Sequence, residues 1–302
     1  MSASPLGSIP FITYGTTRLG DVTIPPADRV ELALAAMRKG VYFHTSSSYG
    51  EAVHILASAF QREPESIPKL IIKLFGESTT EIRVNAVKYT RTLGVPAIEI
   101  GQLCPGGGVW ADLARGGSCY QDLRQLRADG IVRRFILEVF PWTSPNAFRA
   151  LKGGYLDGTV DALIFYFNPL QRFASNELWD LVQSTGAPWL ALRTVAGGDL
   201  YRLRDVPGVA WRPYLQERAA QVAPIFEQSG AASWPEFCVR FAASFDKVLG
   251  TVGASSKLSR LEDLLSAAER RTPLPQGTVQ SLLALQRRWS EDVDMPSEPW
   301  SM

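Results

Sequence analysis

The chain has 302 residues, of which 46% are hydrophobic and 20% charged, so its composition excludes a disordered chain and allows a sizeable buried core. Its formal net charge is +1 without a basic block, which excludes an electrostatic case for nucleic acid or an anionic membrane surface and favours a small-molecule substrate. No apolar run approaches the roughly 20 residues of a membrane span, and the N-terminus lacks the features of a signal peptide. We therefore expect a cytoplasmic protein, and the sequence carries no signal of its oligomeric state.

The cysteines and histidines are too few and too scattered to form a metal site. The three cysteines lack Cys-x-x-Cys spacing, and the only histidines are His44 and His54. A zinc cluster needs more such ligands at short spacings. We therefore expect no metal.

Short apolar runs alternate with longer amphipathic segments along the chain, which is typical of buried parallel strands followed by helices. The predicted strands are residues 10–14, 41–45, 70–73, 97–103, 135–139, 162–167, 189–193 and 248–252. The predicted helices are residues 26–39, 52–60, 79–93, 113–129, 146–151, 175–184, 233–245 and 258–268. Because eight strand–helix units occur without a Gly-x-Gly-x-x-Gly motif after the first strand, we expect one (β/α)8 TIM barrel domain over residues 1–302.

Residues 278–302 are expected to form a C-terminal helix, ending near Trp289, and an acidic tail that contains proline. In a barrel, such a tail can return over the mouth and make Trp300 a wall of the pocket. The alternative is a frayed terminus.

Two polar residues stand where the second and third strands end. Tyr49 lies on the turn after the second strand, and Lys73 is the last residue of the third. Because the carboxyl ends of parallel strands meet at one end of a barrel, Tyr49 and Lys73 are expected to lie close together. A nearby cation favours phenolate, so Lys73 is expected to lower the pKa of Tyr49 and make it a tuned proton donor.

Several motifs together resemble the aldo-keto reductase family in their order and spacing, over nearly the whole chain. They are Gly15-Thr16, the turn from His44-Thr45 to Tyr49-Gly50, Lys73, Gln102-Leu103-Cys104-Pro105, Thr251-Val252-Gly253-Ala254-Ser255 and Arg260. Members of that family are (β/α)8 barrels that bind NADPH without a Rossmann fold and reduce aldehydes and ketones with an Asp, Tyr, Lys, His tetrad. The resemblance implies that Tyr49 is the general acid and Lys73 the cation that lowers its pKa.

The resemblance also implies that two tetrad positions are altered. His44 stands where the family has aspartate, and Cys104 where it has histidine. A neutral imidazole can accept the hydrogen bond of Lys73 but supplies no charge, so Lys73 is expected to deprotonate more easily and in turn to depress the pKa of His44. A thiol is a weaker hydrogen-bond donor than an imidazole, so carbonyl reduction is expected to be slowed.

The resemblance places the phosphate end of NADPH at the loop before the last barrel helix. Gly253, Ser255 and Ser256 follow a strand and open a helix, so backbone N–H groups, the helix dipole and two hydroxyls converge on an anion. Arg260 lies where the family grips the adenosine 2′-phosphate and Asp263 at an adenine-contacting position. This favours NADPH over NADH; an ordinary capped helix is the alternative.

Further cofactor and substrate contacts are implied around the mouth. Thr16 is a cofactor candidate after the first strand, and Glu138 is the polar residue left at the positions that hold the carboxamide, which align with Glu138, Val139 and Ile164. Arg193, after the seventh strand, could bind a cofactor phosphate or an acidic substrate, or form a salt bridge at the rim. Trp110, next to a flexible loop of glycines 106 to 108, and Trp142 are expected to wall the pocket together with Trp300, which favours a partly apolar substrate.

Three functions are consistent with these residues. The first is an NADPH-dependent reductase of a carbonyl or imine with Tyr49 as acid, in which His44 and Cys104 are altered tetrad members. The second is a lyase, isomerase or cyclase on the same barrel that uses Lys73 as a base or amine nucleophile. The third is a binding or regulatory protein that keeps the cofactor as a structural ligand, because fold alone does not separate these functions.

Overall fold

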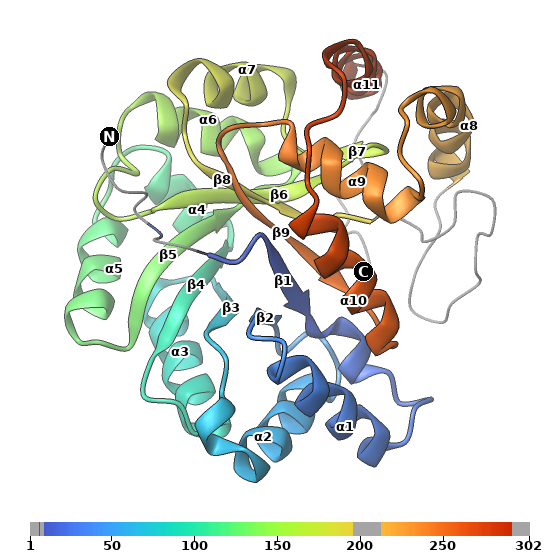
Figure 1. The fold of residues 1–302 in the computed structure, drawn as a ribbon. Coiled ribbons are helices and arrows are strands. Elements are labelled where there is room, and N and C mark those ends of the chain that lie inside the picture. The colour runs from blue at the N-terminus through green and yellow to red at the C-terminus, as the bar shows by residue number, and fades with distance from the viewer. Residues whose placement is uncertain (1–5, 7–8, 196–212, 292–302) are drawn as a thin grey trace.

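A closed barrel of eight parallel strands forms the centre of the computed structural model, which describes residues 6, 9–195 and 213–291 (Figure 1). The strands are β1 (Ile12–Gly15), β2 (Tyr42–Thr45), β3 (Leu70–Gly76), β4 (Ile98–Pro105), β5 (Val132–Glu138), β6 (Ala162–Asn168), β8 (Trp189–Leu192) and β9 (Val248–Ala254). They pair in the order β5-β4-β3-β2-β1-β9-β8-β6, and the pairing of β5 with β6 closes the ring. The predicted (β/α)8 TIM barrel is confirmed.

Eleven α-helices within the described residues surround the barrel (Figure 1). They are α1 (Pro26–Met37), α2 (Ala52–Arg62), α3 (Thr79–Leu93), α4 (Gly107–Leu113), α5 (Cys119–Ala128), α6 (Ser144–Lys152), α7 (Asn176–Thr185), α8 (Pro213–Gln228), α9 (Trp234–Ala243), α10 (Leu258–Glu269) and α11 (Gln276–Glu291). Three short 3-10 helices, η1 (Thr16–Gly20), η2 (Pro64–Ser66) and η3 (Pro141–Thr143), and the two-residue strand β7 (Gln171–Arg172) complete the elements.

The region after β4 differs from the single helix expected over residues 113–129. Two helices occupy it, and the glycines expected to form a flexible loop instead begin α4, where Trp110 N donates to Gly106 O at 2.9 Å. The helices separate because Gly116 has a φ of +70° and the Asp112 carboxylate accepts from the backbone N–H of Cys119 at 2.7 Å. A side-chain cap therefore starts α5 anew. Trp110 is buried on α4.

Aromatic side chains fill the interface between β6, β8 and the helices α7 and α9. Phe165 and Phe167 of β6 stack on Trp189 and Trp179 respectively, at ring separations of 4.9 and 5.3 Å. All seven residues of β6 are buried, as expected for a parallel strand covered on both faces. Burying each such ring contributes about 2–3 kcal/mol, which fixes β6 firmly in the barrel.

The C-terminal helix α11 packs beside the carboxyl end of β6. Gln286 Nε2 donates to Asn168 O at 2.9 Å, and Trp289 Nε1 donates to Gln221 Oε1 of α8 at 3.2 Å. The predicted C-terminal helix is thus present over Gln276–Glu291. The tail and Trp300 lie outside the described residues, so the place of Trp300 in the pocket wall stays a prediction.

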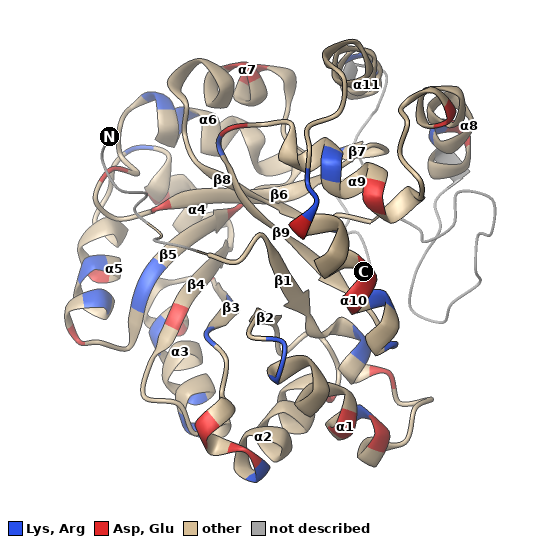
Figure 2. Ribbon diagram, viewed as in Figure 1, with Lys and Arg blue, Asp and Glu red and all other residues tan. Residues whose placement is uncertain are grey.

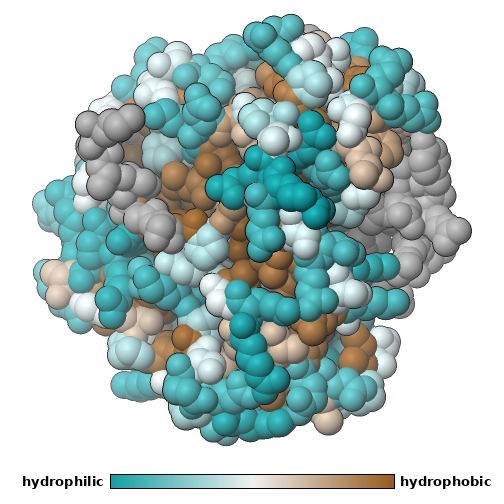
Figure 3. Space-filling model, viewed as in Figure 1, coloured by the Kyte–Doolittle hydropathy of each residue, from teal (hydrophilic) through white to brown (hydrophobic). Residues whose placement is uncertain are grey.

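Charges of both signs lie on the outer helices and loops, and no face of one sign appears in this view (Figure 2). Apolar atoms gather in the middle of the same face, where Figure 1 places the strands, inside a hydrophilic ring (Figure 3). None of the helices within the described residues combines the length and the apolar character that a membrane crossing requires.

Candidate active site

A buried ion pair lies at the carboxyl end of the barrel, between β3 and β5. Lys73 Nζ lies 2.8 Å from Glu138 Oε1, and both side chains are at most 4% exposed. β4 separates the two strands, with Gln102 directly opposite Lys73 in the register, so the pair reaches across a whole strand. Lys73 therefore has a carboxylate partner, which sequence reasoning had missed.

The two partners keep each other charged. Burial alone lowers the pKa of the Lys73 ammonium, but the Glu138 carboxylate raises it well above its ordinary value. Burial likewise opposes ionisation of Glu138, and the ammonium nevertheless holds the pKa of that carboxyl below its usual range. The expectation that Lys73 deprotonates easily is therefore wrong, because Glu138 on another strand supplies a carboxylate beside the ammonium.

The second oxygen of the carboxylate is also bonded. Cys104 Sγ donates to Glu138 Oε2 at 2.7 Å. Burial, followed by the negative charge of Glu138, raises the pKa of the Cys104 thiol well above its ordinary value. The thiol therefore stays protonated, and its single proton is directed at Glu138 rather than at a substrate. A contact between Glu138 and a cofactor carboxamide stays a prediction, since both carboxylate oxygens already have protein donors.

His44 lies in the barrel interior, and its partner is Gln102 rather than Lys73. His44 Nε2 is 2.8 Å from Gln102 Oε1, while His44 Nδ1 has no hydrogen-bond partner among the described residues. Burial first, and then the charge of Lys73, lower the pKa of His44 to about 4. The predicted depression of this pKa is confirmed, whereas the predicted hydrogen bond to Lys73 is wrong. Lys73 already has the Glu138 carboxylate as its partner. A carboxylate placed at position 44 would thus add a second negative charge near the same lysine.

Tyr49 is held at the mouth by its own turn and by α2. The backbone of Tyr49 passes so close to Gly20 that a Cβ at residue 20 would lie 1.8 Å from Tyr49 O. The next turn is anchored by Glu51, whose carboxylate lies 2.7 Å from the buried guanidinium of Arg29. These contacts fix the main chain on either side of the Tyr49 ring.

The Tyr49 phenol is buried and stays protonated. Its hydroxyl has no hydrogen-bond partner among the described residues, and its ring centroid is 5.9 Å from that of His44. Burial raises the pKa of Tyr49, and the charge of Lys73 opposes that rise without reversing it. The expected direction of the lysine effect is confirmed, but the expected net lowering is wrong because burial dominates. The neutral phenol keeps a proton to donate.

A second tyrosine joins this group, which sequence reasoning missed. Tyr166 on β6 is buried, and Lys73, Glu138 and Cys104 all affect its pKa, which burial raises. Its ring stacks on Phe173 at 4.5 Å. Strand alternation could have found it, because Tyr166 lies two residues beyond Ile164, on the same face of β6.

The predicted pocket wall at Trp142 is linked to this tyrosine through Phe140. Trp142 stacks on Phe140 at a ring separation of 4.8 Å, and Phe140 is 6.2 Å from Tyr166. The two rings are half-buried, so the site has a partly apolar border after β5. Whether Trp110 or Trp142 contacts a substrate stays a prediction.

The N-terminus of α10 has free donors for an anion. Its N-cap residue Lys257 forms no side-chain cap, and the N–H groups of Leu258 and Ser259 have no acceptor among the described residues, whereas Arg260 N donates to Lys257 O at 3.2 Å. Gly253 and Ser255 precede it, and the loop is fixed by Tyr14 Oη, which donates to Ser255 O at 2.9 Å. Ser256 is half-buried in this loop.

Some of the remaining cofactor candidates are exposed, whereas others already form hydrogen bonds within the protein. Arg260 and Asp263 are exposed on α10. The Thr16 hydroxyl donates to Thr45 Oγ1 at 2.9 Å and serves the β1–β2 contact. Ser255 Oγ likewise bonds within its own loop, to Lys257. This loop and α10 therefore fit a phosphate group through backbone N–H groups and a nearby guanidinium.

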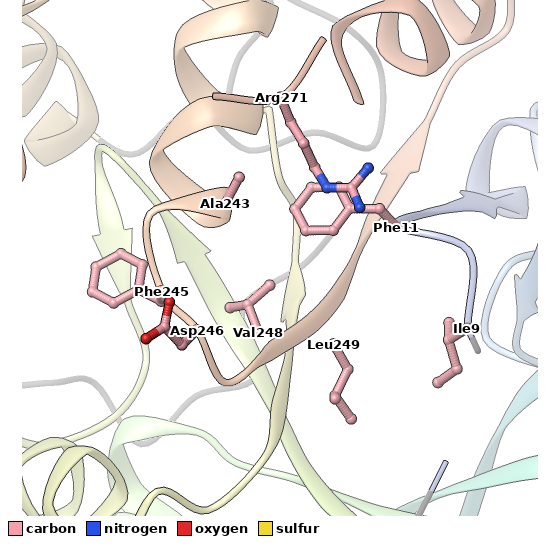
Figure 4. Close-up of a pocket in the computed structure, with 8 residues that line it drawn as sticks. All are labelled: Ile9, Phe11, Ala243, Phe245, Asp246, Val248, Leu249 and Arg271. Carbon is pink, nitrogen blue, oxygen red and sulfur yellow. The ribbon is translucent and has the colours of Figure 1, made fainter. Parts of the chain in front are cut away.

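A separate hollow of about 280 Å³ lies at the opposite end of the barrel. Residues before β1 and at the start of β9 line it, together with Arg271, whose guanidinium lies over the Phe11 ring at 4.8 Å (Figure 4). Parallel strands begin at this end, whereas Tyr49 follows the carboxyl end of β2 and Glu138 is the last residue of β5. No group of three His, Cys, Asp or Glu side chains in the described part of the chain could hold a metal ion.

Comparison with known proteins decides the family. The model of the aldo/keto reductase family matches residues 11–286. The chain belongs to the aldo-keto reductase family. No curated protein sequence matches it.

Solved structures of other aldo-keto reductases share the fold at low identity. The holo form of one from Bacillus halodurans is 18% identical, with a TM-score of 0.68 over 92% of this chain and 95% of that one. One from Klebsiella pneumoniae, solved in complex with NADP and acetate, is 16% identical, with a TM-score of 0.67 over 93% of each chain. The family match includes every residue of the site from Thr16 to Asp263.

Proposed function

We propose that this aldo-keto reductase is an NADPH-dependent reductase of a small, partly apolar carbonyl or imine, with Tyr49 as general acid. One observation carries the proposal: the Tyr49 hydroxyl has no hydrogen-bond partner among the described residues and lies within the electrostatic reach of a lysine that is held charged. A free phenol proton beside a fixed cation is what protonation of a substrate oxygen or nitrogen needs.

The family and the geometry together support NADPH as the reductant. The family uses NAD(P)H, and the relative from Klebsiella pneumoniae was solved with NADP. In this chain the first turn of α10, Ser256 and Arg260 would hold the phosphate end. When bound, the cofactor supplies the hydride.

The side chains of the mouth divide the remaining work. Tyr49 donates its proton to the substrate oxygen or nitrogen, and Lys73 stabilises the phenolate that forms. Glu138 keeps Lys73 protonated, and the Cys104 thiol stabilises the Glu138 carboxylate. In this proposal His44 and Cys104 occupy the aspartate and histidine positions of the family tetrad, and Glu138 supplies the charge that His44 lacks.

The alternative in which Lys73 acts as a base or amine nucleophile receives no support from this arrangement. A nucleophilic lysine must be neutral, whereas the Glu138 carboxylate raises the pKa of Lys73. A cofactor-binding protein without activity is separated from a reductase by experiment.

The test is Tyr49→Phe, assayed by oxidation of NADPH with a panel of aldehydes, ketones and cyclic imines. We expect turnover to fall by roughly a hundredfold or more while NADPH affinity, followed by tryptophan fluorescence, stays within about twofold. The matched control is Tyr120→Phe, which removes a buried hydroxyl bonded to Leu113 O away from the mouth. Turnover of Tyr49→Phe within about threefold of wild type would reject the assignment, and lack of NADPH binding by wild type would reject the reductase.

A further inference from the structure

Arg193, directly after β8, is held in a backbone conformation that side chains disfavour. Its φ is +55°, and no other non-glycine residue in the described ranges has a positive φ. Such a conformation costs free energy and persists where the surroundings impose it, often at ligand sites. Hydrogen bonds on both sides hold it here, since Asn168 Nδ2 donates to Arg193 O at 3.0 Å and Thr194 N donates to Val252 O at 3.3 Å. Asn168 is in turn fixed by Leu170 N and Gln286 Nε2.

Among the described residues, the Arg193 guanidinium has no carboxylate partner. It lies over the Tyr166 ring, 5.7 Å from its centroid, and none of the ion pairs formed by the described residues includes it. The side chain is half-buried. Tyr166 adds a neutral hydroxyl that has no hydrogen-bond partner in the described part of the chain. The Arg193 cation therefore lies over the ring of a tyrosine whose hydroxyl is free within the described part of the chain.

The other charged groups of the mouth, within the described part of the chain, leave the Arg193 cation unbalanced. Lys73 and Glu138 neutralise each other, and the buried His44 imidazole is neutral at working pH. The group formed by these residues with Arg193 consequently has one excess positive charge. A half-buried charge is stabilised by a partner of opposite sign, so the site favours an anionic ligand.

The direction of the Arg193 side chain indicates whether the anion belongs to the cofactor or to the substrate. β8 lies between β6 and β9, and the phosphate-binding loop with Ser255 follows β9. Arg193 turns the other way, onto Tyr166 of β6. Tyr166 in turn lies within the electrostatic reach of Lys73 and Glu138. The guanidinium thus borders the reacting end of the site.

We propose that Arg193 and Tyr166 bind a carboxylate group of the substrate, so that the protein reduces carbonyl compounds that carry a carboxylate. Arg193 provides paired N–H donors in a plane that matches a carboxylate, and the Tyr166 hydroxyl adds a further donor. This inference rests on the proposed reductase function and specifies its substrate class.

The test compares benzaldehyde with 2-, 3- and 4-carboxybenzaldehyde as substrates of the full-length enzyme with NADPH. We expect wild type to prefer at least one carboxylated aldehyde by tenfold or more in kcat/KM. Arg193→Met should lower this preference at least tenfold, mainly through KM, and Tyr166→Phe should lower it less. The matched control is Arg271→Met, which removes a guanidinium from an aromatic ring at the other end of the barrel.

Calorimetric titration with 4-(hydroxymethyl)benzoate, with and without NADPH, supplies a readout that needs no turnover. If the wild-type protein reduces neither class of aldehyde, the reductase function is rejected. If the same protein binds 4-(hydroxymethyl)benzoate and Arg193→Met weakens that binding tenfold, the carboxylate site is supported independently. Equal activity of wild type on all four aldehydes would overturn the proposal. So would an Arg193→Met variant that loses activity on all four equally and binds NADPH tenfold more weakly, because the anion would then belong to the cofactor.

Discussion

The two sides of the barrel mouth differ in how their polar groups are satisfied. On the side of β3 to β5, Lys73 and Cys104 each bond to the buried carboxylate of Glu138. On the side of β8 and β9, Arg193 has no carboxylate partner within the described residues, and the first turn of α10 has no side-chain cap. The difference indicates that the first side is set for chemistry before any ligand arrives, whereas the second depends on ligands for its partners.

The largest effect is expected from breaking the satisfied side with Glu138→Gln. This change leaves the Lys73 ammonium buried without a counter-charge, which typically costs about 3–5 kcal/mol of unfolding free energy. Urea denaturation measures it. Activity should fall as well, because Lys73 no longer stays reliably charged.

Two controls separate charge from packing in this experiment. The double variant Glu138→Gln with Lys73→Met should recover much of the stability but none of the activity. Asp180→Asn breaks the exposed pair with Arg287 and should cost less than about 1 kcal/mol. A cost for Glu138→Gln no larger than that of Asp180→Asn would contradict a buried, satisfied group.

The next largest effect is the pH dependence that comes from His44. Its pKa of about 4 in the folded protein lies below the ordinary value of 6.5, so the unfolded chain takes up the proton first as pH falls. The stability from neutral His44 is complete above about pH 6.5 and should be lost as pH falls toward 4, by about 3 kcal/mol in total.

Proton NMR and denaturation at several pH values check this dependence. His54→Gln leaves His44 as the single histidine signal, which should titrate near pH 4. His44→Gln should remove this part of the acid loss of stability. A His44 signal that titrates at its ordinary value would show that the imidazole is not sealed inside the barrel.

The smallest effect is expected on the ligand-dependent side, from Arg260→Met. Loss of one exposed, charge-assisted contact to the 2′-phosphate should weaken NADPH binding about five- to tenfold and leave NADH binding within about twofold. Fluorescence titration of both cofactors measures it. Arg270→Met, at the far end of α10, is the matched control. An equal loss for both cofactors would place Arg260 elsewhere than at the 2′-phosphate.

The sequence predicted the barrel and its direction well because both depend on local patterns. Apolar runs separated by amphipathic helices suffice for eight parallel strands, and the position of Tyr49 after β2 places it at the mouth. Lys73 was expected to end the third strand, but β3 continues to Gly76, so Lys73 lies midway along it. Such local patterns do not predict the pairing of Lys73 with Glu138. It depends on two side chains that reach across β4, and chain position alone does not give their directions.

The same limit explains the other misses. His44 was assigned to Lys73 because the family pattern puts those positions together, yet Gln102 on β4 lies nearer. Lowering of the Tyr49 pKa was expected from the cation alone, and the burial that reverses it is a property of the packed barrel. The start of α4 at Gly107 was hidden because three successive glycines resemble a loop.

The thiol of Cys104 has a practical consequence for handling the protein. Alkylating reagents and peroxide attack thiolates, and burial raises the pKa of Cys104, Cys119 and Cys238 alike. The enzyme should therefore survive storage without reducing agents, and maleimide dyes should leave it unlabelled. A single cysteine introduced on an outer helix would then accept a fluorophore selectively, with no native cysteine to remove first.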